Sequence, residues 1–384
     1  MRELDAKKLQ KTMTRKVKKD IESHRIACAA VTVLQHGETV LSICEGEKNH
    51  DTGEKLMPRD IFRLASMTKP VTAVAALIGV QNGLFDLNDK ISDYFPRFLD
   101  KYIGKLENGH SVAVRKSEKE MRLFHLLSHS NGLLCEDDVG NDQMKYIPEY
   151  AYESNTMMAE YASSNVLLSF EPGEGSAYSA FAGFDVIAGL IEKKSGMTYG
   201  DFLKKYLFDP LGLKDMTFIP SEEQWSRMVS VHDVSAYKND FITVNLGRHT
   251  FEKFPLHFTS AGASLVGTLE DYTVFAEMLR GKGEYKGVRI LEKDVAELMT
   301  KCYVPKGTPG RDDYTGWGLG VRLIEDGQVL PAGSFGWSGA YGTHFWVDPE
   351  NDITAVYLKS MRWYDCGEGT AFEFEKTVMS SLTD

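Results

Sequence analysis

Hydrophobic positions recur with helical spacing at the start of the chain. Leu9, Met13, Val17 and Ile21 follow one another at every fourth position, and most residues between them are polar or basic. This pattern predicts an amphipathic helix over residues 1–21 with its apolar face on the body of the protein. Acidic residues in the same stretch argue against a transit peptide or a helix that binds an anionic membrane.

Two apolar, β-branched runs come next. Residues 26–34 and 39–44 flank the turn dipeptide His36-Gly37, so an antiparallel hairpin is expected. Strand character then returns only late in the chain. The late strands are predicted at 317–324, 342–347 and 353–359, with a turn at 348–352.

Between the early and late strands, to about residue 240, the pattern is mainly helical. Helices are predicted at 70–83, 121–128, 157–169, 181–194 and 199–208, with a closing helix at 371–382. A sheet built from both chain ends predicts an α/β (α+β) fold, in which terminal helices flank an antiparallel sheet and a helical lobe is inserted. The predicted lobes are 1–80 with 255–384 (sheet) and 81–254 (helical), with the active site in the cleft between them.

Composition narrows the class of protein. A chain of 384 residues is longer than one core usually supports, which favours two lobes. A net charge of −11 argues against nucleic-acid binding. No apolar run approaches the roughly 20 residues of a membrane span, and the first residues lack the apolar core of a signal peptide.

Cysteine usage indicates a reducing compartment. The five cysteines are scattered, odd in number and without a C-x-x-C pair, so free and mostly buried thiols are expected. The cytoplasm is the predicted location. The cysteines are Cys28, Cys44, Cys135, Cys302 and Cys366.

Candidate chemistry begins at Ser66-Met-Thr-Lys69. The two functional residues are three positions apart at the start of a predicted helix, so they share one face. A serine hydroxyl needs a base, and a buried lysine that is partly neutral can take its proton. The helix N-terminus also favours the negative charge that develops on an attacked carbonyl. The pattern alone is weak, because S-x-x-K occurs by chance in many chains.

Three further motifs follow in a fixed order. They are the helix end at 124–133, Tyr178-Ser179-Ala180 after a Pro-Gly breaker, and a glycine-rich run at 336–342. With Ser66-Met-Thr-Lys69, they resemble the serine β-lactamase and penicillin-binding-protein superfamily. More narrowly, they resemble the branch that holds class C β-lactamases and family VIII carboxylesterases. The resemblance spans nearly the whole chain, and the combination is far more specific than any single motif.

The resemblance implies roles for individual residues. Ser66 matches the acyl-enzyme nucleophile, Lys69 its partner base, and Tyr178 the tyrosine that shuttles the proton to the leaving group. The oxyanion hole is implied to consist of the backbone N–H groups of Ser66 and Ala340. Which of Lys69 and Tyr178 is the formal base stays open. No metal or organic cofactor is required.

Departures from the β-lactamase pattern shape the predicted substrate. Trp337-Ser338-Gly339 matches the K-T-G strand motif and, with Tyr341, is expected to bind substrate. Trp337 replaces the lysine that would attract a carboxylate. Ala180 replaces the asparagine of Y-x-N, which would hold an acylamino group. Both changes favour a small-molecule carboxylic ester with a short acyl group over a charged lactam or peptide.

Alternatives stay open at this level. The protein is alternatively a β-lactamase or a D-amino-acid peptidase or esterase, or a non-catalytic penicillin-recognising or structural relative. Acyl transfer to an alcohol or amine is compatible with the same site. Arg362 offers a replacement positive charge, although an exposed strand-end arginine is the commoner case. His125 and His129 stand at zinc-ligand spacing without a third ligand.

Overall fold

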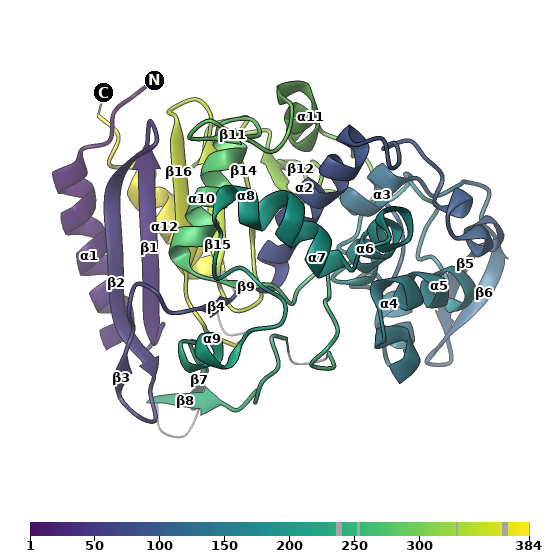
Figure 1. The fold of residues 1–384 in the computed structure, drawn as a ribbon, viewed down its shortest axis with the longest axis horizontal. Coiled ribbons are helices and arrows are strands. Elements are labelled where there is room, and N and C mark those ends of the chain that lie inside the picture. Colours follow the sequence, from purple (N-terminus) through teal and green to yellow (C-terminus); the bar gives the residue numbers. More distant parts are fainter. Residues whose placement is uncertain (236–239, 252–253, 328, 363–367, 384) are drawn as a thin grey trace.

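The computed structural model describes residues 1–235, 240–251, 254–327, 329–362 and 368–383. Within these residues the centre of the molecule is an antiparallel sheet of eight strands, in the order β12-β13-β14-β15-β16-β1-β2-β3 (Figure 1). The N-terminal strands are β1 (Cys28–Gln35), β2 (Glu38–Asn49) and β3 (Glu54–Lys55). The C-terminal strands are β12 (Thr315–Trp317), β13 (Arg322–Ile324), β14 (Phe335–Ser338), β15 (His344–Asp348) and β16 (Ile353–Leu358).

Helices cover both faces of this sheet. α1 (Ala6–Glu22) and α12 (Glu368–Met379) pack on one face, and α10 (Leu269–Arg280) packs on the other, where α2 (Thr68–Gln81) joins the same core (Figure 1). Alternate residues of β15 serve the two faces, since Phe345 lies in the α10 core and Trp346 in the α1 core.

The helices between residues 123 and 203 gather on the side of the molecule away from α1 (Figure 1). The longer ones are α5 (Asn155–Asn165) and α6 (Ala182–Ser195), and α6 is buried over most of its length. Shorter helices are α3 (Leu123–Leu127), α4 (Asp138–Met144), α7 (Tyr199–Leu203), α8 (Asp209–Leu211), α9 (Glu222–Ser226) and α11 (Lys293–Glu297). Small two-stranded ribbons are β4 (Phe62–Arg63) with β9 (Val266–Gly267) and β10 (Glu284–Tyr285) with β11 (Val288–Arg289).

The predicted fold class is confirmed. The amphipathic N-terminal helix, the hairpin of β1 and β2 and the closing helix all form, and the hairpin turn takes positive φ at His36 (53°) and Gly37 (75°). β1 pairs with β16, so the sheet joins the two ends of the chain. The chain ends also meet directly through a bridge between Leu4 and Leu382.

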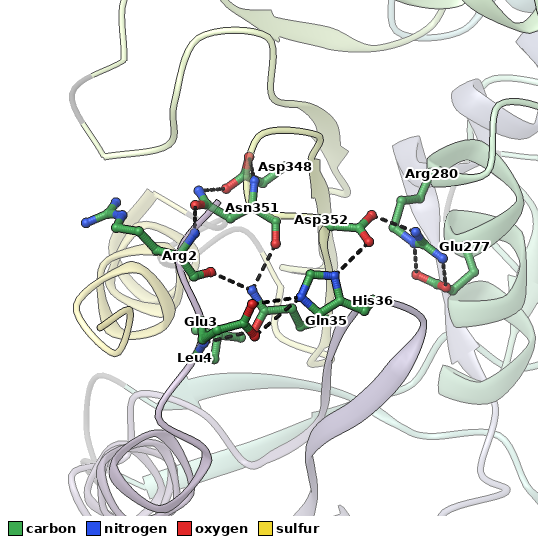
Figure 2. A network of polar contacts seen from close by, with 10 residues as sticks. All are labelled: Arg2, Glu3, Leu4, Gln35, His36, Glu277, Arg280, Asp348, Asn351 and Asp352. Carbon is green, nitrogen blue, oxygen red and sulfur yellow. Dashed lines mark hydrogen bonds and ion pairs between the residues drawn. The ribbon is translucent and has the colours of Figure 1, made fainter. Parts of the chain in front are cut away.

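Polar contacts attach the N-terminal segment to the β1–β2 turn, to the β15–β16 turn and, through that turn, to α10 (Figure 2). Gln35 accepts from the Leu4 N–H (2.8 Å) and donates to the carbonyls of Arg2 (2.8 Å) and Asn351 (2.9 Å). His36 lies 3.1 Å from Glu3 and 3.0 Å from Asp352. A further ion pair joins Asp352 to Arg280 of α10 (2.6 Å). The hairpin turn therefore connects the N-terminus to the β15–β16 turn and to α10.

One predicted strand was wrong. The predicted strand at 317–324 is instead the end of β12, a turn and then β13, and the two strands pair with each other. Gly320 has a φ of 69° in that turn, and its N–H donates to the carbonyl of Leu127 (2.8 Å). A strand cannot continue through this conformation, so a contact with a distant helix end breaks the apolar run.

The helical region also contains two hairpins that the prediction missed. β5 (Tyr102–Glu107) pairs with β6 (His110–Lys116), and β7 (Val231–Ser235) pairs with β8 (Asp240–Val244). The first hairpin turns at Asn108-Gly109, where both residues have positive φ. Asn-Gly is the strongest short hairpin signal, so this error was avoidable.

Three other expectations concern membrane spans, cysteine thiols and the division into lobes. None of the helices within the described ranges is long and apolar enough to cross a membrane. Cys28, Cys44, Cys135 and Cys302 carry free thiols, whereas Cys366 lies outside the described residues. The division into lobes at 80/81 and 254/255 stays a prediction.

Candidate active site

Ser66 lies in a 3-10 turn (Ala65–Met67) directly before α2. Ala65 has a φ of 48°, an uncommon conformation for a residue with a side chain. The turn is held by Thr68, whose hydroxyl donates to the Ala65 carbonyl (2.6 Å). As a result, Ser66 is half-buried at the N-terminus of a buried helix, where N–H groups point toward incoming negative charge.

Lys69 occupies the first turn of α2 and is fully buried. Its Nζ lies 3.2 Å from Ser66 Oγ, and it donates to the carbonyls of Ala180 (2.6 Å) and Gly262 (2.9 Å). Burial lowers the pKa of Lys69 to about 7, although Asp185 and Glu136 oppose this shift. A neutral amine has two N–H groups. The two carbonyls accept both, so its lone pair is left for the Ser66 hydroxyl proton.

Tyr178 faces the same amine. Its ring centroid lies 4.7 Å from Lys69 Nζ and 5.5 Å from the centroid of the Trp337 ring. Burial raises the pKa of Tyr178 above its ordinary value, while the adjacent Ser66 hydroxyl and Trp337 indole act in the opposite direction. The phenol therefore stays protonated near neutral pH and is suited to donate a proton rather than to accept one.

His129 is a neighbour that the motif analysis did not place in the site. Its ring lies between Tyr178 (4.6 Å) and Trp317 (4.4 Å), and its Nδ1 accepts from the Ser179 N–H (3.1 Å). Burial, and then the charge of Lys69, lower the pKa of His129 well below its ordinary value. A neutral His129 thus positions the Tyr178 segment. Among the described residues no cluster of His, Cys, Asp and Glu is arranged to hold a metal ion.

Strand β14 ends against the segment that carries Ser66. A Cβ on Gly339 would lie 2.3 Å from the Leu64 carbonyl oxygen and 2.3 Å from Thr343 Oγ1. Thr343 in turn donates to the Leu64 carbonyl (3.0 Å). Only glycine permits this close approach. It brings the backbone before Ala340 next to the turn Ala65–Met67, which carries Ser66. The oxyanion hole formed by Ser66 and Ala340 stays a prediction.

The predicted substrate-binding residues occupy different environments. The Trp337 ring borders Tyr178, as described above. The Ser338 hydroxyl lies 2.8 Å from Nδ1 of His344. The other ring nitrogen of His344, Nε2, lies 3.0 Å from Oε1 of Glu375 in α12. Tyr341 is only 1% exposed and packs in an apolar cluster that includes Ala65. Substrate contact by Ser338, Gly339 and Tyr341 stays a prediction.

Two cavities adjoin these residues. One of about 420 Å³ is lined by Phe181 and Ala182, which follow the Ala180 carbonyl that accepts from Lys69, and by apolar side chains such as Met158 and Phe254. A second of about 800 Å³ is lined by polar and aromatic residues. Four of those are Trp317, Trp337, Ser338 and His344.

The sequence motifs name the candidate reactive groups but do not reveal the carbonyls around Lys69. Gly262 is too close to its neighbours for any side chain, since a Cβ would lie 2.7 Å from the Ala180 oxygen. No local sequence pattern predicts this contact between Gly262 and the Ala180 backbone, because the two residues are far apart in sequence. A weak signal did exist for Asp185, which is a lone acid within the apolar run 182–191.

Comparisons with known proteins identify the family of the chain. The model of the family described as "Beta-lactamase" matches residues 13–361. Esterase EstB from Burkholderia gladioli is 26% identical over 382 residues, which cover 92% of this chain and 91% of EstB. Protein Rv1367c from Mycobacterium tuberculosis is 27% identical over 353 residues, covering 86% of this chain and 84% of that protein.

Solved structures share the fold. EstCE1, described as a hydrolase with promiscuous acyltransferase activity, has a TM-score of 0.80 at 21% identity and covers 98% of both chains. Simvastatin synthase (LovD) from Aspergillus terreus has a TM-score of 0.79 at 17% identity and covers 97% of both chains. The chain therefore belongs to the beta-lactamase family and is a serine hydrolase of that family.

Proposed function

We propose that the protein cleaves carboxylic esters of short acyl groups through an acyl-enzyme on Ser66. The observation that carries this proposal is the 3.2 Å contact between Lys69 Nζ and Ser66 Oγ, made by a buried amine whose pKa is lowered to about 7. Ser66 Oγ attacks the ester carbonyl while Lys69 takes its proton. The oxyanion rests on the N–H groups of Ser66 and Ala340.

Collapse of this intermediate breaks the bond to the leaving alkoxide. The alkoxide receives a proton from Tyr178, which regains one from the Lys69 ammonium. Water then attacks the acyl-enzyme by the reverse sequence and releases the acid. In this assignment Lys69 is the formal base, because the pKa of Tyr178 is raised while that of Lys69 is lowered.

Support for an ester substrate comes from two directions. The position of the K-T-G lysine holds Trp337, whose ring joins the aromatic wall around Tyr178 and provides no cation for a carboxylate. Proteins similar in sequence include Esterase EstB and the lovastatin esterase of Penicillium rubens. The latter is 30% identical over 221 residues (55% of this chain, 54% of that enzyme).

The test compares two substrates and two serine variants. Wild type should hydrolyse p-nitrophenyl butyrate far faster than nitrocefin, and Ser66→Ala should abolish ester cleavage. Ser226→Ala, an exposed serine on α9, is the control and should keep full activity. Intact-mass measurement during turnover should find a butyryl adduct on wild type only. Nitrocefin turnover equal to ester turnover would favour a β-lactamase, and an active Ser66→Ala protein would refute the mechanism.

A further inference from the structure

A buried carboxyl group lies behind Lys69, outside the predicted catalytic set. Asp185 belongs to the first turn of α6, shortly after the Tyr178 motif, and is 1% exposed among apolar residues. Burial is costly for a carboxylate and raises the pKa of Asp185 to about 7, against the effect of its hydrogen bonds and of Lys69. A group kept at such a cost calls for an explanation of what it does there.

Its hydrogen bonds lead to the Lys69 amine. Asp185 Oδ1 accepts from Ser260 Oγ (3.0 Å) and from the Ala261 N–H (2.8 Å). The next residue, Gly262, provides one of the two carbonyls that accept from Lys69 Nζ. The other carbonyl, of Ala180, lies just before α6, the helix that carries Asp185. A single carboxyl thus ties together the two backbone segments that hold the amine.

We propose that Asp185 is a positioning residue for Lys69, which keeps the two carbonyl acceptors in place and supplies the negative charge that balances the ammonium form. This inference rests on the proposed function, because it assumes that Lys69 is the base. A second tie supports the geometry. Thr72 of α2, one turn after Lys69, donates to the Ala261 carbonyl (2.6 Å), so segment 260–262 is fixed from both helices.

The charged and titratable groups around the pair define the expected pH effect. Lys69 interacts with Asp185 and Glu136, which favour its ammonium form, and it lies beside the neutral rings of His129 and Tyr178. On the other side, Tyr152 and Tyr199 interact with the Asp185 charge. An ionised Asp185 raises the pKa of Lys69. Its removal should therefore leave Lys69 neutral at lower pH.

The first experiment removes the charge and keeps the acceptor. In Asp185→Asn, the acid limb of kcat/KM for p-nitrophenyl butyrate should move to lower pH by about 0.5 unit or more, with the plateau within about threefold of wild type. Asp271→Asn is the matched control. Asp271 is also a buried carboxyl that accepts a backbone N–H, from Asp215 (2.6 Å), but on α10. The acid limb of the kcat/KM profile of Asp271→Asn should coincide with that of wild type.

The second experiment removes the tie. Asp185→Ala should lower kcat about tenfold or more while KM stays within about twofold, because the amine loses its alignment with Ser66. If Asp185→Ala does not fold, Ser260→Ala removes one donor from the same carboxyl and should lower kcat in the same way to a smaller extent. Circular dichroism identifies variants that are folded.

The results separate this inference from the proposed function. If wild type does not hydrolyse the ester, or Ser66→Ala stays active, the proposed function fails; if Lys69→Arg keeps wild-type activity, Lys69 is not the base and the acid limb does not belong to it. If Lys69→Arg is inactive but the limb of folded Asp185→Asn coincides with wild type and Asp271→Asn, only the charge-balancing role of Asp185 is overturned. A folded Asp185→Ala with unchanged kcat overturns its positioning role.

Discussion

At the scale of single residues, the chemistry depends on the protonation state of Lys69. The amine is useful as a base only when neutral, and its lowered pKa places that change near pH 7 instead of near the ordinary lysine value of about 10.4. The environment that lowers the pKa is burial, and two carbonyl acceptors at 2.6 and 2.9 Å orient the amine within it.

The pH dependence of the reaction follows with a definite sign. Since the proposed mechanism uses the neutral amine, kcat/KM for p-nitrophenyl butyrate should rise with pH and level off above a midpoint near 7. Lys69→Arg keeps a cation that does not lose its proton, so it should lower kcat/KM at pH 8 by about 10²–10⁴-fold. Initial rates from pH 5.5 to 8.5 measure both effects.

Lys101 provides the matched control for this measurement. It is also buried with a pKa lowered to about 7, but its Nζ donates to carbonyls at the end of α5, such as that of Ala162 (2.7 Å). Lys101→Gln should lower the melting temperature and leave the acid limb in place. A limb that moves in Lys101→Gln and not in Lys69→Arg would contradict the assignment.

Tyr178 should matter through its hydroxyl and not through its ring. Tyr178→Phe keeps the aromatic contacts with His129 and Trp337, so the fold should be unchanged, but the leaving alkoxide loses its proton donor. We expect kcat to fall about 10²-fold or more. Tyr303→Phe, a half-buried tyrosine that packs on Phe124, should have wild-type rates. A Tyr178→Phe enzyme within threefold of wild type would remove Tyr178 from the mechanism.

At the scale of elements, the site depends on how closely β14 approaches the turn before α2. Gly339→Ala would place a methyl group 2.3 Å from a backbone oxygen, so the strand end must shift. We expect a loss of about 1–3 kcal/mol in the free energy of unfolding, measured by urea denaturation, and a fall in kcat because the Ala340 N–H moves with the strand.

A second glycine controls for the substitution itself. Gly200 lies in α7, and a Cβ there would have no atom within 4 Å. Gly200→Ala should be neutral or stabilising by about 0.5–1 kcal/mol, since alanine is favoured in helices. Equal effects of the two substitutions would show that close packing at Gly339 is unimportant.

Element boundaries illustrate where local patterns suffice. α1 and α2 follow from apolar spacing, and the β1–β2 hairpin from its turn residues. The break between β12 and β13 does not follow, because it depends on the contact of Gly320 with Leu127, far away in sequence. The hairpin at Asn108-Gly109 is different, because the Asn-Gly pair is a local signal from which this turn could have been predicted.

At the scale of the whole molecule, the network in Figure 2 couples the N-terminal segment to the sheet and to α10. Its histidine gives the stability of the fold a pH dependence. Hydrogen bonds that His36 donates to the carboxylates of Asp352 and Glu3 raise the pKa of His36 above its unfolded value of about 6.5. The stabilisation is therefore complete below the unfolded pKa and is lost as the pH rises through the folded pKa.

His36→Gln tests this linkage. The difference in melting temperature between wild type and variant should be larger at pH 5.5 than at pH 8.5. His110→Gln, at an exposed position on β6, is the control and should give a difference that does not depend on pH. A His36→Gln difference that grows with pH would contradict the charge-based explanation.

The sequence by itself determined the candidate residues Ser66, Lys69 and Tyr178 and the general plan of the fold. Ser66 and Lys69 stand three residues apart, in the turn before α2 and in its first turn, so their proximity is a local property of the chain. Apolar periodicity and turn residues likewise specify the terminal helices and the main hairpin, because each depends on neighbours in sequence.

Only the tertiary structure decided what surrounds these candidate residues. The carbonyls of Ala180 and Gly262 are far from Lys69 in sequence, and so are Asp185 and the His129 ring. The burial of Lys69 lowers the pKa of its amine, and the two carbonyls fix the direction of the amine; both result from the packing of several segments at once. A linear pattern records which groups are present, whereas the free energy of a charge depends on everything packed around it.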